Sequence, residues 1–224
     1  MAVLFVVIPQ NPIKNMLLGC QSNSNPVFTH SPADLSKIAY IVPPGNVEEY
    51  GGGVKVLKTH SYFKGPNKVE IRAPIDSTLF RGVYVMEGGI DQYALFFRVS
   101  CEVYYLLDHV VDPVEKIKNA FPDTPAHSTG DMTNTPKVEF KAGELVGYSI
   151  GKKFEQWDFG VYNETRNNDF SDLGKDVPIH GRDRIADCSF DYFPEELRQQ
   201  FYSKFASHLT GVPVPDRFCK GDDI

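Results

Sequence analysis

Alternating hydrophobic and polar positions recur along the chain and predict many short β-strands. The clearest case is 69–75, VEIRAPI, in which apolar residues occupy every second position, as in a strand with one buried face. Segment 93–107, YALFFRVSCEVYYLL, is rich in aromatic and β-branched residues, which favours two central strands or one long bent strand. Further short strands are expected within 38–42, 54–63 and 138–159. The predicted core is therefore mostly β.

The C-terminal segment has a different period. After Pro194, apolar residues recur at every fourth position, at Leu197, Phe201, Phe205 and Leu209. This spacing predicts a helix whose single apolar stripe packs on the β-core. A shorter helix is expected after the Asp-Pro-Val-Glu sequence at 112–115, which combines an N-cap, a first-turn proline and a capping acid.

These patterns divide the chain into three parts. Residues 1–34 begin apolar and continue through the polar stretch QSNSNPVFTHSPAD, so we expect an export signal or a tether. Residues 35–185 hold the predicted strands and form the β domain, and residues 186–224 form a helical C-terminal extension. A chain of 224 residues is long enough to bury one substantial core.

Charge narrows the functional classes. The formal net charge is −6 and the basic residues are scattered, so a nucleic-acid partner is not expected, because phosphate binding needs a basic surface.

The apolar start, MAVLFVVIP, is too short to span a bilayer. An export signal would place the protein outside the cytoplasm, in the periplasm or the cell envelope.

The four cysteines lack the CxxC spacing of zinc ribbons and thioredoxin-type sites. Cys188 and Cys219 flank one C-terminal segment and are disulfide candidates, whereas Cys101 lies in an apolar strand and is expected to be a buried free thiol. Cys20 ends a Leu-Leu-Gly-Cys sequence that is similar to a bacterial lipoprotein cleavage box. A lipid anchor at Cys20 is one interpretation, and an apolar segment with an incidental cysteine is the other.

Three segments, taken in order, resemble the lysostaphin-type zinc endopeptidases of peptidoglycan, also called the duplicated-hybrid-motif family. Segment 68–84, KVEIRAPIDSTLFRGVY, is similar to the family's Ala-Pro strand, and 103–110, VYYLLDHV, is similar to its Tyr-x-His-Leu sequence. Segment 140–163, FKAGELVGYSIGKKFEQWDFGVYN, is similar to the glycine-rich turn that precedes the family's final His-Leu-His-Phe-Glu-Val. The resemblance implies a barrel-sandwich hybrid of short antiparallel strands, here with a C-terminal helix.

The resemblance also implies where a zinc site would lie. The family supplies a His and an Asp four residues apart, then a further His, then a final His-x-His pair. Carried onto this chain, these positions fall on Pro66, Glu70, His109, Gln156 and Asp158. Most ligand histidines are therefore replaced. An altered metal set would consist of Glu70, Asp158 and a displaced His60, and the alternative is that the carboxylates are ordinary strand residues paired with Lys or Arg.

The same positions outline a candidate binding groove of Glu70, His109, Gln156, Trp157 and Asp158. Gln156 and Asp158 share one face of their strand because side chains alternate. That face would point into the family's groove, and His109 and Gln156 would occupy its catalytic positions. Trp157 has two interpretations: it packs in the core, or it stacks on a sugar ring at the rim.

Three functions remain open. The first is a non-catalytic, peptidase-like protein without a cofactor, whose groove binds a cell-wall glycopeptide or a protein partner. The second is an active zinc endopeptidase with altered ligands. The third is a biotinyl- or lipoyl-type carrier domain, which the glycine-rich turn resembles, although it lacks the Met-Lys-Met or Asp-Lys-Ala sequence that presents a modified lysine.

Overall fold

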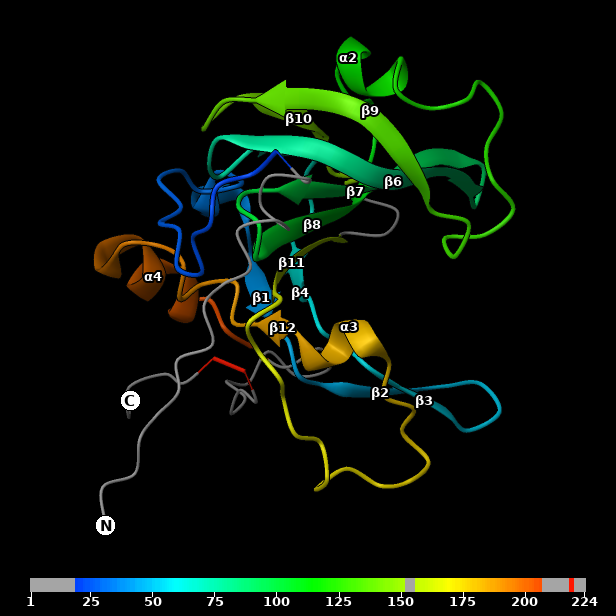
Figure 1. Cartoon of the computed structure of the whole chain (residues 1–224). Coiled ribbons are helices and arrows are strands. Elements are labelled where there is room, and N and C mark those ends of the chain that lie inside the picture. The colour runs from blue at the N-terminus through cyan, green and yellow to red at the C-terminus, as the bar shows by residue number, and fades with distance from the viewer. Residues whose placement is uncertain (1–18, 152–155, 207–217, 220–224) are drawn as a thin grey trace.

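The computed structural model describes residues 19–151, 156–206 and 218–219, which consist mainly of antiparallel strands (Figure 1). The main sheet has the order β1 (Tyr40–Val42), β4 (Ser61–Lys64), β11 (Gln156–Asn163), β8 (Val103–Val110), β7 (Ile90–Arg98), β6 (Ser77–Glu87) and β9 (Thr133–Phe140), with β12 (Ala186–Asp187) beside β11. Two smaller sheets pair β10 (Leu145–Tyr148) with β5 (Glu70–Arg72) and β2 (Val47–Tyr50) with β3 (Val54–Leu57). The prediction of a mostly β fold is confirmed.

The described helices are short: η1 (Leu35–Lys37), α2 (Glu115–Lys118), α3 (Gly181–Arg184) and α4 (Glu195–Tyr202). The C-terminal helix ends earlier than its apolar stripe predicts, because the chain after it pairs with β1: the N–H of Ile41 donates to the carbonyl of Lys204, and the N–H of Ala206 donates to the carbonyl of Ile41. Leu209 lies outside the described residues. Among the described helices, none is long and apolar enough to cross a membrane.

One large apolar core lies against one face of the main sheet. It includes the fully buried side chains of Phe28, Ile71, Phe97, Phe159 and Phe201, which come from the N-terminal segment, β5, β7, β11 and α4. The core therefore joins the main sheet to β5 and to the C-terminal helix. Burial of this much aromatic surface is the main stabilising contribution to the fold.

The N-terminal segment from residue 19 to 34 packs on the β domain and is not a tether. Phe28 lies 6.0 Å from Tyr105 between ring centroids, and a disulfide joins Cys20 to Cys101. The free thiol expected at Cys101 and the lipid anchor considered at Cys20 are therefore wrong, because each sulfur is bonded to the other.

The predicted disulfide between Cys188 and Cys219 is confirmed. Two disulfides are typical of proteins that reside in an oxidising compartment outside the cytoplasm. The predicted boundary between 185 and 186 does not separate two parts of the molecule, because β12 pairs with β11 in the main sheet.

Candidate functional site

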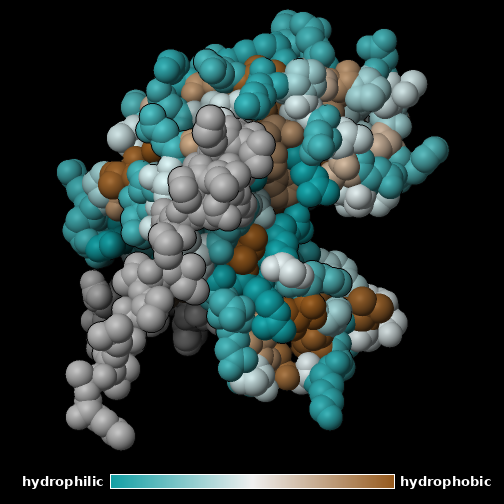
Figure 2. All heavy atoms as spheres, in the orientation of Figure 1, coloured by the Kyte–Doolittle hydropathy of each residue, from teal (hydrophilic) through white to brown (hydrophobic). Residues whose placement is uncertain are grey.

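A groove opens on the main sheet where β4, β11 and β8 lie side by side. Figure 2 shows a hollow between the part of the molecule that carries β6 to β9 and the part that carries β2, β3 and α3, with hydrophilic residues at its inner end. The groove lies between these parts and has a cavity of about 340 Å³. Its lining residues are Glu48, Tyr50, Lys58, Tyr62, Glu87, Gln92, His109, Gln156 and Asp158.

Strand register places the polar side chains in rows across the sheet. Asp158 of β11 is paired with Tyr62 of β4 on one side and with Asp108 of β8 on the other. Directly paired residues point to the same face of a sheet, so these three side chains share the groove face. Gln156 and Lys64 form the next row. The expectation that Gln156 and Asp158 share the groove face is confirmed.

His109 joins this face through an unusual backbone conformation. In a regular strand it would point away from Asp108, but its φ of +59° is a left-handed conformation that few non-glycine residues adopt. The imidazole Nε2 then lies 3.6 Å from Oδ2 of Asp158. The other ring nitrogen, Nδ1, lies 2.6 Å from Oε1 of the buried Gln92. Because an amide oxygen only accepts hydrogen bonds, Nδ1 carries a proton.

His60 approaches the same carboxylate from the segment that precedes β4. Its Nε2 lies 3.3 Å from Oδ2 of Asp158. Gly160 makes this approach possible, because a Cβ at that position would lie 2.9 Å from the Cβ of His60. The glycine in the sequence QWDFGVYN therefore provides the space that the histidine occupies.

The Asp158 carboxyl is only 2% exposed, and burial raises its pKa from the usual value to about 7. The neighbouring His109 opposes this rise, and Asp108 adds to it. The more distant ammonium groups of Lys58 and Lys64 also oppose it. These positive groups therefore offset only part of the burial, and the ionised form of Asp158 remains disfavoured.

The two histidines respond in opposite directions. Burial lowers the pKa of His60 to about 3, so its ring is neutral. Burial also disfavours charge on His109, but the carboxylates of Asp158 and Asp108 overcome this effect and raise the pKa of His109. Two imidazoles thus flank one buried carboxylate, and the ring of His109 carries the balancing charge when Asp158 is ionised.

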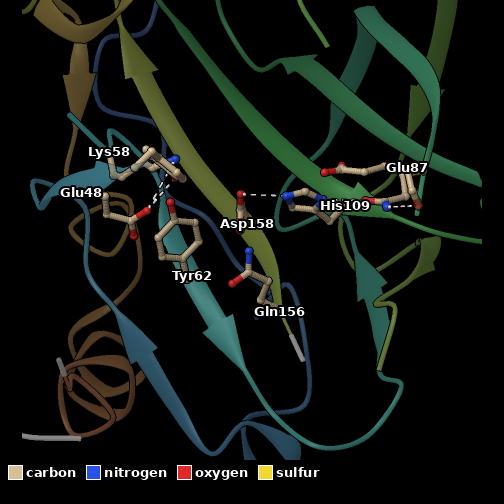
Figure 3. Close-up of a pocket in the computed structure, with 9 residues that line it drawn as sticks. Glu48, Lys58, Tyr62, Glu87, His109, Gln156 and Asp158 are labelled. Carbon is tan, nitrogen blue, oxygen red and sulfur yellow. Dashed lines mark hydrogen bonds and ion pairs between the residues drawn. The ribbon is translucent and has the colours of Figure 1, made fainter. Parts of the chain in front are cut away.

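Lys58, Tyr62 and Gln156 border the other side of the groove (Figure 3), and Lys64 lies next to Gln156. The buried Lys64 donates from Nζ to Oε1 of Gln156. Nζ of Lys58 lies 3.9 Å from Oε2 of Glu48. Both ammonium groups lie near the Tyr62 ring, at 5.7 Å for Lys58 and 5.5 Å for Lys64 from the ring centroid, within the range of cation–π attraction.

Three of the predicted groove residues come together, and two do not. His109, Gln156 and Asp158 line the groove. Glu70 lies elsewhere, because β5 pairs with β10 rather than with β4 or β11, and its carboxylate pairs with the guanidinium of Arg72. Trp157 points to the opposite face of β11 and packs in the core, with its ring centroid 4.3 Å from that of Phe63.

The sequence analysis did not identify β4 and the residue just before it as part of the site. It placed the His-x-x-x-Asp spacing on Pro66 and Glu70, whereas the two residues four apart that border this site are His60 and Lys64. A signal was present, since positions 60, 62 and 64 fall on one face of a strand.

The residues at the groove do not fit the zinc site that the family resemblance implies. Among the described residues, the potential ligand atoms of Asp108, His109 and Asp158 lie within 4.8 Å of one another, an oxygen-rich set for zinc. Oδ1 of Asp108 already accepts the backbone N–H of His109 at 2.7 Å.

No family model matches the chain, and no curated protein matches it. Two solved structures are similar in fold. Csd3 of Helicobacter pylori matches at a TM-score of 0.36 and 15% identity over 80% of this chain, and the chain spans 40% of the length of that protein. A structure described as the SpoIIQ–SpoIIIAH pore-forming complex matches at a TM-score of 0.44 and 8% identity, over 79% of this chain and 98% of the matched chain.

Proposed function

We propose that this chain is a non-catalytic, peptidase-like protein outside the cytoplasm, and that its groove binds a cell-wall glycopeptide or a protein partner. The observation that supports this proposal most directly is the contact between Lys64 and Gln156. It places an ammonium beside the groove residue Gln156, whose amide oxygen accepts from it. Neither group is an ordinary zinc ligand.

The surroundings of Asp158 and the size of the cavity also support a binding role. His109, Lys58 and Lys64 only partly offset the burial that raises the pKa of Asp158, so its ionised form gains from a positively charged group in the groove. Oδ2 of Asp158 faces both imidazoles. The cavity of about 340 Å³ is at the lower end of the range for small-ligand pockets.

The proposal is tested by metal analysis and a hydrolysis assay on the full chain prepared without chelator. We expect less than stoichiometric zinc and no cleavage of cross-linked peptidoglycan peptides. Stoichiometric zinc together with cleavage would overturn the proposal in favour of an endopeptidase with altered ligands. The intact mass is expected to match the unmodified chain, and an added biotinyl or lipoyl group would support a carrier domain instead.

A matched variant makes this test sharper. The double substitution Lys64→Asp with Asp158→His supplies an aspartate four residues after His60 and a histidine on β11. If lost ligands explain the loss of metal, this variant is expected to bind zinc when the unaltered chain does not. The single substitution Asp158→His is the control, because it leaves the ammonium of Lys64 in place.

A further inference from the structure

Two carboxylate oxygens at the groove lack hydrogen-bond donors. Oδ1 of Asp158 and Oε1 of Glu48 are buried, and neither accepts a hydrogen bond from the described part of the chain. Both residues line the groove. A buried acceptor without a donor is unfavourable, so a ligand that supplies N–H donors would satisfy both.

Two features around Asp158 destabilise the folded chain. Asp108 is paired with Asp158 across β8 and β11, and like charges directly opposite each other destabilise a sheet. His109 holds a left-handed backbone conformation, which is unfavourable for a residue with a Cβ. Strain and like-charge pairing at one point of a groove indicate a ligand site more than a stabilising feature.

Near Asp158, the groove has more negative than positive side chains. Four carboxylates belong to it or border it, those of Glu48, Glu87, Asp108 and Asp158. Lys58 is paired with Glu48, and Lys64 donates to Gln156. His109 balances one further charge at most. A cationic ligand group therefore complements the end of the groove at Asp108 and Asp158.

We propose that the groove binds a peptide through a primary ammonium group that donates to Oδ1 of Asp158 and is attracted by Asp108. This inference rests on the proposed binding function. Oδ2 of Asp158 already faces two imidazoles, so Oδ1 is the oxygen that lacks a donor. A guanidinium prefers two parallel bonds to both carboxylate oxygens, whereas an ammonium is a compact charge that binds through single donors.

The ammonium can belong to the amino terminus of a peptide or to a lysine-type side chain. Tyr62 lies between Asp158 and Glu48 (Figure 3). Oε1 of Glu48, which lacks a donor, can accept a second N–H, such as a backbone amide of the same peptide. The two sources of the ammonium share one chemistry, and they are distinguished by the choice of probe.

The test uses the full chain and three synthetic tripeptide amides, with affinity measured by NMR titration. Ala-Ala-Ala has only an N-terminal amine, N-acetyl-Ala-Lys-Ala has only a side-chain amine, and N-acetyl-Ala-acetyllysine-Ala has neither. We expect at least one amine-bearing peptide to bind about tenfold or more tightly than the peptide without an amine, as for one charge-assisted hydrogen bond. The tighter of the two identifies the source.

Two substitutions test whether the preference for an amine-bearing peptide arises in the groove. Asp108→Asn, which keeps the size of the side chain, is expected to reduce the preference for the amine severalfold, and Glu87→Gln serves as a second groove variant if Asp108→Asn fails to fold. Glu70→Gln is the matched control, because this carboxylate lies on β5 and pairs with Arg72. It is expected to leave the preference unchanged.

Equal binding of the amine-bearing and acetylated peptides would overturn the inference but leave the non-catalytic proposal standing. Failure of all three peptides to bind at about 10 mM would also overturn the inference, since even weak specific contacts are measurable there. An amine preference that Asp108→Asn and Glu87→Gln both leave intact would show that the amine binds elsewhere. The non-catalytic proposal fails separately, through zinc content and hydrolysis.

Discussion

The two faces of β11 differ in the chemistry of the side chains that they carry. On one face, Trp157, Phe159 and Val161 are fully buried in an aromatic core. On the other, Gln156 and Asp158 meet the side chains of β4 and β8, and Gly160 leaves space for His60. One face is stabilised by apolar packing, and the other carries the polar and charged groups of the groove.

This difference shows how a strand can keep its fold while its chemistry changes. The core face depends on shape and volume, which tolerate little change. The groove face depends on which polar group opposes which, so a few substitutions can change its chemistry and leave the core unaltered. We infer that β11 is held in place by its apolar face and that its polar face is free to specialise.

The largest expected effect is on the core face. Trp157→Ala is expected to lower the free energy of unfolding by about 3–5 kcal/mol, because it leaves a cavity beside Phe63. Gln156→Ala, one residue away on the groove face, is expected to cost about 1 kcal/mol, as for one hydrogen bond. Chemical denaturation of both variants measures the difference, and equal losses would contradict the assignment of the two faces.

A smaller effect is expected where the groove face is most crowded. Gly160→Ala would bring a methyl group within 2.9 Å of the Cβ of His60, and such overpacking costs about 1–3 kcal/mol. It should also displace His60 from Asp158, visible as a change in the histidine NMR signals. Gly51→Ala is the control, because a Cβ there meets no atom within 4 Å. A stable Gly160→Ala protein with unchanged histidine signals would contradict the packing described here.

The third prediction concerns pH. The pKa of Asp158 is raised from 3.8 to about 7, so between these values the folded protein holds a proton that the unfolded chain has lost. Its contribution to the free energy of unfolding therefore falls as the pH rises through this window. The pKa of His60 is lowered from 6.5 to about 3, so its contribution rises with pH over that range. The two contributions oppose each other between about pH 4 and 6.5.

Removing either partner should expose the contribution of the other. Relative to the unaltered chain, Asp158→Asn is expected to make stability rise more steeply from pH 4 to 6.5, and His60→Gln is expected to make it fall. The change in slope is at most about 1.4 kcal/mol per pH unit. Denaturation at several pH values measures both slopes. Changes in slope of the same sign in both variants, each measured against the unaltered chain, would contradict the opposing pKa shifts.

The alternation of β11 was predictable from sequence, because its apolar and polar residues occupy alternate positions. The partners of its polar face were not. Glu70 seemed a ligand by its spacing, but the pairing of β5 with β10 is a long-range property that local pattern does not encode. His109 enters the groove through a left-handed φ, which a strand pattern does not predict.

The N-terminal segment also makes long-range contacts that its sequence pattern did not predict. Its polar composition suggested a tether, yet Phe28 is buried and the disulfide from Cys20 reaches Cys101. These are contacts between residues far apart in sequence, and composition carries no information about them. Spacing did suffice for Cys188 and Cys219, which close a shorter segment of the chain.

The most direct test of the central claim is a zinc titration of the unaltered chain, followed through the ring nitrogen signals of His60 and His109 by NMR. If the groove is not a zinc site, one equivalent of zinc leaves both signals unchanged. If both signals shift in proportion to zinc and saturate at one equivalent, the groove is a metal site and the claim is wrong.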